Sequence, residues 1–552
     1  MRHSGGVHHS PCLVELRGGR ILTKRYKAFA QRAGLARATG LALPLLVLAL
    51  AALVYGLYGF DGVLLRDYSI YLYSGQRVAE GVPPYVGIFD HKGPLSPLIA
   101  GFGVMLSGPL HIDDVYAVRL VFCATACLAV VAVYLLGKNV FRSQEAGVFA
   151  AFTFLGFYAY GQPAASGPEP KTPMVLFEAL SLLFLVQKRW FWSGFFGSLA
   201  ALVWQPMGAF AFVAFLLAVT RPREERYGAT LRTVAGIATP VLVTVAYFIY
   251  HGALGDFLDG FILFNVLYLV RGSINLAPQL LGAAGNIIVP YSTMLVPILI
   301  GLVMIVRLYF QRPFQYRFLP IVVSFPAPVL WSLRDFQLAD DFFVFLPYAA
   351  IGFGAFLAAA VRRADNQKVL TVVLSTILLS VALANTSKEI SASAAHKLVG
   401  TTIDLPAQRE GAQEIQERFG DDVKLASINS PQVMVLLHRV NPNPYLWITA
   451  GVDNRIEART PGGFEGWLEG LGEFDPDAIS FFGDGQSLLP SAHLSPEHYQ
   501  ELDSWLDRRY RAVKVGPWWL FVKKDVLMEE AQRKASTESY DTTQALNGLE
   551  SQ

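Results

Sequence analysis

The chain has 552 residues, of which 53% are hydrophobic and only 16% are charged, and its mean hydropathy is +0.39. The charged share lies well below the ~25% of an average soluble domain, which excludes a disordered chain and argues against a single soluble domain. With 45 basic and 43 acidic residues, the net charge of +2 gives no indication of a nucleic-acid partner. Three cysteines are too few for a disulfide framework.

A basic segment over residues 1–40 precedes an apolar run at about 41–60 that lacks a small-residue cleavage pattern. We expect this run to be an uncleaved first membrane span that leaves the N-terminus in the cytoplasm. Apolar runs of roughly 15–23 residues, about the length that crosses ~30 Å of hydrocarbon, continue to residue 386. Further spans are expected near 114–136, 146–160, 173–187, 190–204, 206–220, 232–250, 285–306, 318–333, 342–361 and 369–386. The short run 95–108, bracketed by prolines, is expected to be re-entrant or interfacial.

The predicted fold class is therefore an α-helical polytopic membrane protein with about 11 spans. The loops that this topology places inside all carry lysine or arginine, as the positive-inside rule requires. They are 137–145, 187–190, 221–231, 307–317 and 362–368. The odd number of spans places residues 387–552 outside the cell membrane.

The segment 387–525 alternates predicted strands and helices, which is typical of a small α/β domain. Strands are expected at 423–429, 445–449, 478–482, 511–515 and 518–522, and helices at 431–438, 464–471 and 496–510. This extracytoplasmic domain is acidic. The polar tail 526–552 is expected to be disordered.

Ionisable residues are almost absent from the predicted spans, with Arg119 and Glu178 as the clear exceptions. Charge inside a membrane is costly and is by default a functional hypothesis. Most other outer charges lie on the loops 61–94 and 161–172. A transporter would instead place charged residues or broken helices near the midplane of the membrane.

Three stretches of the first loop carry a family resemblance: Asp67-Tyr68-Ser69-Ile70-Tyr71, Gly81-Val82-Pro83-Pro84-Tyr85 and Asp90-His91-Lys92-Gly93-Pro94-Leu95. Together with Ser166-Gly167-Pro168-Glu169-Pro170, Arg119-Leu120, Trp204-Gln205-Pro206 and the Arg334–Tyr348 stretch, they resemble the GT-C superfamily. These multispan glycosyltransferases use polyprenyl-phosphate-linked sugars. Among its branches, the chain looks most like the archaeal dolichyl-phosphate-mannose mannosyltransferases of surface-protein (S-layer) glycosylation. The resemblance covers most of residues 41–525.

Two positions depart from the family pattern. The family's loop often reads Lys-Pro-Pro, whereas this chain has Lys92-Gly93-Pro94, and Gln205 stands where a lysine is usual. The second change puts an additional phosphate-binding cation in doubt. The Trp-Trp-Asp signature of oligosaccharyltransferases is absent as well, because Leu520 follows Trp518-Trp519.

The resemblance implies an inverting transfer of a hexose, most likely mannose, from dolichyl phosphate to an external glycan or glycoprotein. Nucleotide sugars are cytoplasmic, so an outward-facing transferase needs a lipid-borne donor. Transfer to an alcohol needs a base, for which Asp67 is the candidate, and cations that stabilise the leaving phosphate. Candidates for those cations are Lys92, Arg119 and Arg271. Glu169, Asp90 and His91 are candidates for the acceptor site or a divalent metal site, although no close ligand spacing demands a metal.

Each assignment has a structural alternative. Asp67 is also placed to cap the first helix of the loop, Lys92 to snorkel at the interface, and Glu169 to be a solvated loop acid. Arg119 could pair with Glu178 or a loop acid and hold the spans together. At the level of the whole protein, the alternatives are a transporter, flippase or lipid-handling scaffold with an external sensor domain, and a membrane assembly protein.

Overall fold

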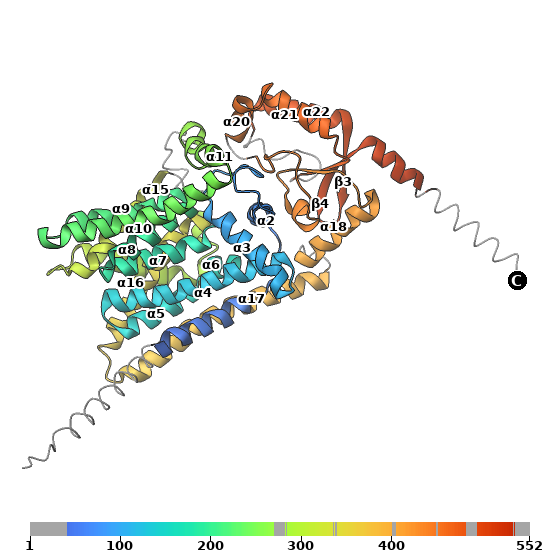
Figure 1. Ribbon diagram of the computed structural model, residues 1–552. Coiled ribbons are helices and arrows are strands. Elements are labelled where there is room, and N and C mark those ends of the chain that lie inside the picture. The colour runs from blue at the N-terminus through green and yellow to red at the C-terminus, as the bar shows by residue number, and fades with distance from the viewer. Residues whose placement is uncertain are drawn as a thin grey trace, which may run out of the picture.

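The computed structural model describes residues 41–269, 282, 284–334, 336, 339–399, 404–448, 451–481, 494–533 and 535. Two parts can be distinguished within these ranges: a helical bundle and a smaller C-terminal α/β unit (Figure 1). The candidate Arg271 lies outside the described residues, as do residues 1–40 and 536–552.

The bundle starts with the helix Leu41–Gly56 and continues with α2 (Arg66–Ala79) in the first loop. The helices that follow are α3 (Leu95–Leu110), α4 (Asp114–Phe141), α5 (Gln144–Leu155), α6 (Tyr158–Ser166), α7 (Thr172–Val186), α8 (Trp190–Val203), η1 (Gln205–Met207), α9 (Gly208–Val219), α10 (Arg223–Tyr250), α11 (Leu254–Leu258) and η2 (Asp259–Leu269). After the undescribed stretch come η3 (Ser292–Met294), α13 (Leu295–Tyr309), η4 (Tyr316–Phe318), α14 (Leu319–Ser324), α15 (Pro326–Arg334), η5 (Ala339–Phe345), α16 (Leu346–Val361) and α17 (Gln367–Val399).

Six helical stretches of the described residues are long and apolar enough to cross a membrane, namely α4, α10, Ser292–Tyr309, Tyr316–Arg334, Ala339–Val361 and the start of α17. Five apolar helices are shorter: Leu41–Gly56, α3, α7, α8 and Gln205–Val219. These helices confirm the polytopic helical fold class, although the predicted span 146–160 coincides only with the 12-residue α5, which is in neither group. The helix α3 has 16 residues and is about 24 Å long at 1.5 Å per residue, shorter than ~30 Å of hydrocarbon.

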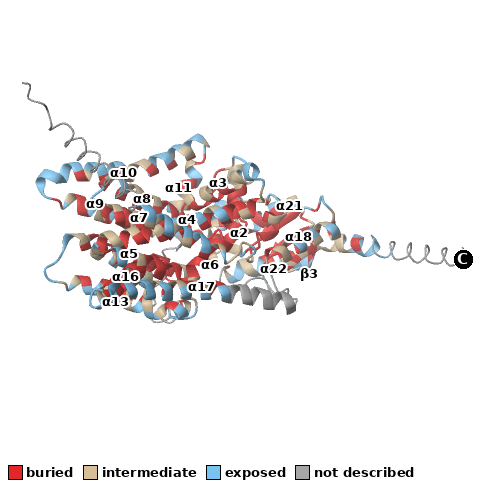
Figure 2. Cartoon of the chain, turned by 90° about the horizontal axis from the view of Figure 1, so that it is seen from below, coloured by how far each residue is buried: buried red, intermediate tan, exposed pale blue. Residues whose placement is uncertain are grey.

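The spans differ in how deeply they lie within the bundle. In the apolar window of Ala339–Val361, 78% of the residues are buried, compared with 22% in α10 and α17. Exposed apolar residues gather on the outer helices, and buried ones fill the centre (Figure 2). The outer helices therefore present the apolar surface expected to face lipid, whereas α4 and α16 form the packed interior.

A long helix connects the two parts. The helix α17 has 33 residues and runs without interruption past residue 387, where the sequence predicts the start of a separate domain. The C-terminal unit follows with α18 (Leu405–Phe419), α19 (Gln432–Leu436), α20 (Val452–Arg459), α21 (Gly463–Phe474) and α22 (Pro496–Arg509). Its strands are β1 (Leu425–Ile428), β2 (Ala478–Phe481), β3 (Tyr510–Val515) and β4 (Trp518–Lys523).

The four strands form one mixed sheet in the order β1-β2-β4-β3. The strands β1 and β2 are parallel, while β4 is antiparallel to both β2 and β3. All residues of β1 and β2 are buried, as in strands covered on both faces. This confirms the predicted small α/β unit.

Two predictions for the C-terminal part are wrong. Residues 445–448 form no strand, because the Leu446 oxygen accepts from the Asn429 amide and the Asn429 side chain binds the Ile448 amide; residues 449–450 lie outside the described ranges. The tail was predicted to be disordered from residue 526, but residues 524–533 are helical. Glu530 at its end accepts a hydrogen bond from Arg418 of α18 at 2.9 Å, which holds this helix against the unit.

The C-terminal unit packs directly on the first loop. One hydrophobic cluster combines Leu64 and Leu72 of the loop with Leu405 and Val433 of the C-terminal unit. A second cluster joins Phe89 of the loop to the buried strands β1 and β2 and to neighbouring aromatic residues. The loop 61–94 is thus enclosed between the bundle and the C-terminal unit.

Candidate active site

The helix α2 positions the first group of polar residues. Asp67 lies in its first turn, where the positive end of the helix dipole favours an anion, and its carboxylate accepts from Arg66 Nε at 3.1 Å. The Asp67 side chain is 38% exposed, so it remains accessible to a substrate. Tyr68 and Tyr71 follow on α2 and are buried. The expected capping alternative is not seen at the N-cap itself, which is Leu65 and forms no side-chain cap.

The segment Asp90-His91-Lys92 is held in a tight turn by Asp90. One oxygen of this buried carboxylate accepts hydrogen bonds from the main-chain amides of His91, at 2.7 Å, and Lys92, at 3.1 Å. Burial raises the pKa of Asp90, an effect that Lys92 and the two amides partly offset. The Lys92 carbonyl in turn accepts from the Tyr85 hydroxyl at 2.6 Å. Asp90 therefore shapes the turn that presents the Lys92 side chain.

Lys92 has no ion pair within 4 Å among the residues that the structure describes. Its ammonium lies 5.8 Å from the centre of the Tyr71 ring, in a cation–π arrangement. It is near enough to Asp90, Glu169 and Asp340 to attract each of them electrostatically. The ammonium thus faces several acids but is not neutralised by any single one.

Glu169 reaches the same place from the second loop. Its carboxylate is buried, and one oxygen accepts from the Lys171 amide at 3.2 Å. Burial and the neighbouring Asp340 raise the pKa of Glu169 to about 8, although Lys171 and Lys92 act in the opposite direction. The negative charges of Asp90, Asp67 and Glu169 all act electrostatically on the Tyr71 hydroxyl. The two loops therefore converge around this tyrosine.

The surroundings of His91 disfavour a protonated imidazole. Its ring lies between Phe264 and Trp447, with ring centres 5.6 and 5.4 Å away. Burial and the nearby Lys92 lower the pKa of His91 to about 3, so the imidazole is neutral. Among the described residues, no three His, Cys, Asp or Glu side chains are arranged to hold a metal. Asp90 is committed to backbone amides and His91 to aromatic rings, so they do not fit the metal site considered from the sequence.

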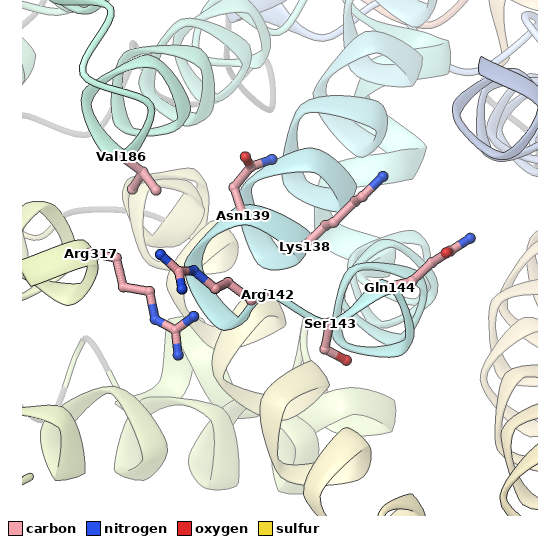
Figure 3. A pocket seen from close by; sticks show the side chains of 7 residues that line it. All are labelled: Lys138, Asn139, Arg142, Ser143, Gln144, Val186 and Arg317. Carbon is pink, nitrogen blue, oxygen red and sulfur yellow. The ribbon is translucent and has the colours of Figure 1, made fainter. Parts of the chain in front are cut away.

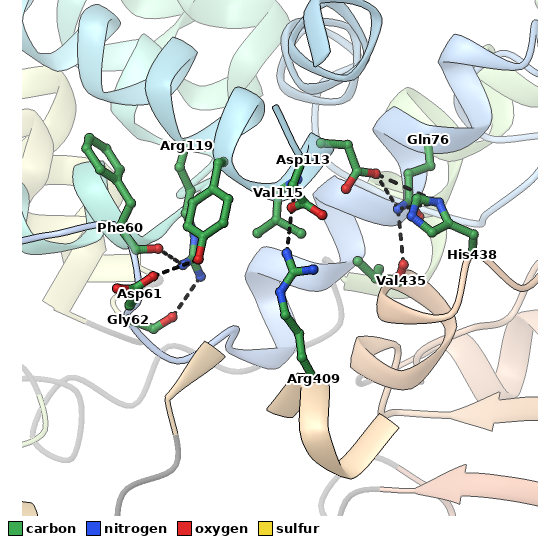
Figure 4. A network of polar contacts seen from close by, with 12 residues as sticks. Phe60, Asp61, Gly62, Gln76, Asp113, Val115, Arg119, Arg409, Val435 and His438 are labelled. Atoms are coloured by element: carbon green, nitrogen blue, oxygen red, sulfur yellow. Dashed lines mark hydrogen bonds and ion pairs between the residues drawn. The ribbon is translucent and has the colours of Figure 1, made fainter. Parts of the chain in front are cut away.

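Arg119 contacts main-chain oxygens at the start of the first loop and in the second loop. Its Nε donates to the Gly167 oxygen at 3.1 Å. Its terminal nitrogens donate to the oxygens of Phe60 and Gly62 (Figure 4). The guanidinium is fully buried and ties both outer loops to α4. This position favours the structural alternative over contact with a donor phosphate. The expected partner Glu178 has no hydrogen bond in the described part of the chain.

A buried cluster of charged residues adjoins the site. The sequence did not predict that these residues would pair. Lys171 donates to Asp340 at 2.6 Å and also binds Asp341, while its ammonium lies 4.8 Å from the centre of the Trp204 ring. Burial lowers the pKa of Lys171, but the two aspartates outweigh burial and raise it overall. The only signal in the sequence was that these charges adjoin predicted spans, because 169 residues separate Lys171 from Asp340.

The two departures from the family pattern have structural roles. Gly93 donates its amide to the Val203 oxygen at 3.1 Å, and a side chain at this position would overlap the Leu202 oxygen. Gln205 donates to the main-chain oxygens of His91, at 2.7 Å, and Phe261, at 3.0 Å. Gln205 therefore positions the Lys92 turn through the backbone and adds no cation to it.

The chain is similar to known proteins in part of its sequence and in its fold. Residues 91–251 match the family Dolichyl-phosphate-mannose-protein mannosyltransferase. The structure is similar to crystal structures of ArnT from Cupriavidus metallidurans, with a TM-score of 0.54 and 13% identity in the apo state. Against ArnT bound to undecaprenyl phosphate, the TM-score is 0.51 and the identity 14%. Each comparison covers 88% of this chain and 98% of ArnT.

The archaeal oligosaccharyltransferase AglB from Archaeoglobus fulgidus, in complex with an inhibitory peptide and a dolichol-phosphate, gives a TM-score of 0.47 at 12% identity. That comparison covers 80% of this chain and 69% of AglB. A search of curated protein sequences finds no match. The fold resemblance to the GT-C glycosyltransferases, expected from the sequence, is confirmed.

Proposed function

We propose that this chain, which has the GT-C fold and matches a mannosyltransferase family over residues 91–251, transfers a sugar from a polyprenyl phosphate. The sugar is a hexose, mannose in the first instance, and the lipid is dolichyl phosphate. The acceptor is a hydroxyl of an external glycan or glycoprotein, such as a surface-layer protein. The observation that carries the proposal is that Lys92, which has no ion pair among the described residues, and the accessible Asp67 both lie near Tyr71, on a loop enclosed by the bundle and the C-terminal unit.

The transfer is a single displacement. The acceptor hydroxyl oxygen attacks the anomeric carbon and forms the new glycosidic bond, while the bond from that carbon to the phosphate oxygen breaks. Asp67 takes the hydroxyl proton, and the lipid phosphate leaves with the bonding electrons. Because attack and departure occur on opposite sides of one carbon, the anomeric configuration inverts. A positioned general base contributes typically 10²–10⁴-fold to such a step.

Lys92 stabilises the phosphate as its negative charge grows. The ammonium lies at the bundle end of the first loop, one residue before Gly93, which is locked against Val203. A cation fixed in advance at the leaving group stabilises the transition state without reorganisation. Glu169, with its pKa raised to about 8, is largely protonated near neutral pH and is proposed to donate a hydrogen bond to the donor or acceptor.

The proposal also includes the side of the membrane that the site faces. The site and the C-terminal unit lie at one end of the bundle, and the basic loops predicted to be inside lie at the other. The proposed active site therefore opens on the outer face of the cell membrane, where the sugar must arrive on a lipid. A reporter fused after residue 535 tests this placement; activity of a cytoplasmic reporter there would contradict it.

The catalytic test uses labelled lipid-phosphate mannose and membranes that contain single variants. Lys92→Ala is expected to weaken use of the donor, with a raised KM for the lipid, because the phosphate loses its cation. Arg119 provides a contrast: Arg119→Gln is expected to lower the amount of folded protein, because three backbone oxygens lose their donor. Transfer by Lys92→Ala with an unchanged donor dependence would reject the phosphate role.

A further inference from the structure

A cavity of about 530 Å³ lies at the end of the bundle opposite the candidate active site. It is lined by Lys138, Asn139, Arg142, Ser143, Gln144, Val186 and Arg317. The helix α4 relates the two ends: its N-terminus adjoins the C-terminal unit, and its 28 residues span roughly 40 Å at 1.5 Å per residue before the cavity is reached. The cavity is thus separate from the proposed transfer site.

The lining contains three cations and no acid. Arg142 and Arg317 approach one another from different helical elements, and their guanidinium groups are turned toward each other (Figure 3). They are close enough for Arg142 to repel Arg317. Neither forms an ion pair with an acid among the described residues, and the Nε of Arg317 is buried without a hydrogen-bond partner. Two like charges held together are unfavourable unless an anion lies between them.

The neighbouring polar groups do not neutralise these cations. The hydroxyl of Ser143 donates to Glu145 at 2.7 Å, which directs the nearest acid in the sequence toward Ser143. The amide nitrogen of Asn139 donates to the Leu135 oxygen of its own helix at 2.7 Å. The charged donors of the lining are those of Lys138, Arg142 and Arg317.

The backbone at Arg142 supports a role beyond helix termination. Arg142 is the C-cap of α4 and adopts a left-handed conformation with φ of 50°. Glycine adopts this conformation without strain, whereas in other residues it raises the conformational free energy. Such strained residues are concentrated at functional positions. An arginine at this position projects a guanidinium into the cavity at the cost of that strain.

We propose that this cavity binds a phosphate group, held by Arg142 and Arg317 with Lys138 as the third cation. Guanidinium groups bind phosphate oxygens through paired, charge-assisted hydrogen bonds. The cavity lies at the end of α4, a helix long and apolar enough to cross a membrane, and basic pockets at the ends of such helices bind anionic lipids. The phosphate is carried by an anionic phospholipid or by a soluble phosphate, and the two sources are separable by experiment.

The test uses the purified full-length protein in detergent. Native mass spectrometry compares phosphatidylglycerol with phosphatidylcholine of the same acyl chains, and thermal unfolding compares inorganic phosphate with chloride at equal ionic strength. Wild-type protein is expected to retain phosphatidylglycerol at least tenfold better than phosphatidylcholine. The double variant Arg142→Gln/Arg317→Gln should lose this preference, and Arg317→Lys should keep most of it.

Matched variants make the outcome decisive. Arg363→Gln removes the same charge from an exposed position just after α16, at the same end of the bundle, and should bind lipid as wild type does. Because Arg142 is exposed, Arg142→Gln alone keeps the comparison available if the double variant does not fold. Stabilisation by inorganic phosphate that depends on the arginines, without a lipid preference, would identify a soluble ligand. No preference for either phosphate source in wild-type protein, or equal binding by Arg142→Gln, would overturn the proposal.

Discussion

Trp447 of the C-terminal unit donates its indole N–H to the main-chain oxygen of Phe89, 2.9 Å away in the first loop. The same indole packs against His91, and the Phe89 amide donates to the Pro444 oxygen at 2.7 Å. These contacts come from a segment more than 350 residues away and reach His91, the residue before Lys92. The C-terminal unit therefore helps to position the loop that carries the proposed phosphate ligand.

Trp447→Phe is expected to reduce transfer about tenfold, mainly through a higher KM for the lipid donor, and to destabilise the protein. The buried Phe89 oxygen would lose its donor, which costs about 1–3 kcal/mol. Initial rates over a range of donor concentrations, together with thermal unfolding, measure both effects.

Trp467→Phe is the matched control for this experiment. Trp467 is buried in the same unit, and its indole nitrogen has no partner in the described part of the structure. Its substitution should leave the donor KM unchanged. Equal effects of the two substitutions would mean that Trp447 acts only through packing.

Lys171→Met should reduce folded protein far more than Lys92→Met does. Lys171 neutralises Asp340 and Asp341 in a buried cluster, and removing one partner of a buried ion pair costs about 3–5 kcal/mol. The thermal unfolding temperatures of the two variants in one detergent give the comparison. Adding Asp340→Asn and Asp341→Asn to Lys171→Met should recover part of the loss; a stable Lys171→Met would show that the cluster contributes little.

The raised pKa of Glu169 predicts that the free energy of unfolding falls at alkaline pH. Its pKa is about 8 in the folded protein and near 4.5 when unfolded, so the folded state binds the proton more tightly. The stabilisation is complete below pH 4.5, declines as the pH rises, and is lost once the pH exceeds about 8. A pKa difference of one corresponds to about 1.4 kcal/mol. Unfolding temperatures of wild type and Glu169→Gln from pH 5 to 9 should diverge progressively, with the variant less sensitive.

Glu465→Gln serves as the reference for that titration, since Glu465 is exposed on α21 and should follow the wild-type curve. A Glu169→Gln curve parallel to wild type across the whole range would contradict the raised pKa.

Gly93→Ala should abolish transfer and reduce folded protein, because the added methyl group would overlap the Leu202 oxygen. Gly470→Ala, within α21, meets no atom within 4 Å and should be neutral or slightly stabilising. Size-exclusion profiles and transfer rates compare the two. Normal activity of Gly93→Ala would show that the Lys92 turn can accommodate a methyl group, contrary to the close packing against α8.

Sequence alone predicted the helical bundle well, because spans are specified by local apolar length. It also predicted the strands β1 to β4, whose alternating or buried patterns are local too. The 445–448 segment was mistaken for a strand because its apolar composition serves contacts with Asn429 and Phe89, which only the tertiary fold brings together.

The site residues proposed from the sequence stay predictions, but the structure shows which of them lie near one another. Asp67, Lys92 and Glu169 converge around Tyr71, as two facing loops allow. Arg119 was a candidate both for the donor phosphate and for a structural contact, and its guanidinium donates to loop main-chain oxygens that no side-chain pattern reveals. The cluster of Lys171 with Asp340 and Asp341 joins distant segments, and charge spacing along the chain cannot predict such pairing.

Asp67 is proposed to remove the acceptor proton, and the decisive experiment is Asp67→Asn in membranes supplied with labelled lipid-phosphate mannose. The side chain is 38% exposed, so the neutral isostere should fold as wild type does. We predict that the transfer rate at saturating donor falls at least 100-fold, with little change in the donor KM, as expected for loss of a general base. Transfer by folded Asp67→Asn at the wild-type rate would contradict the account.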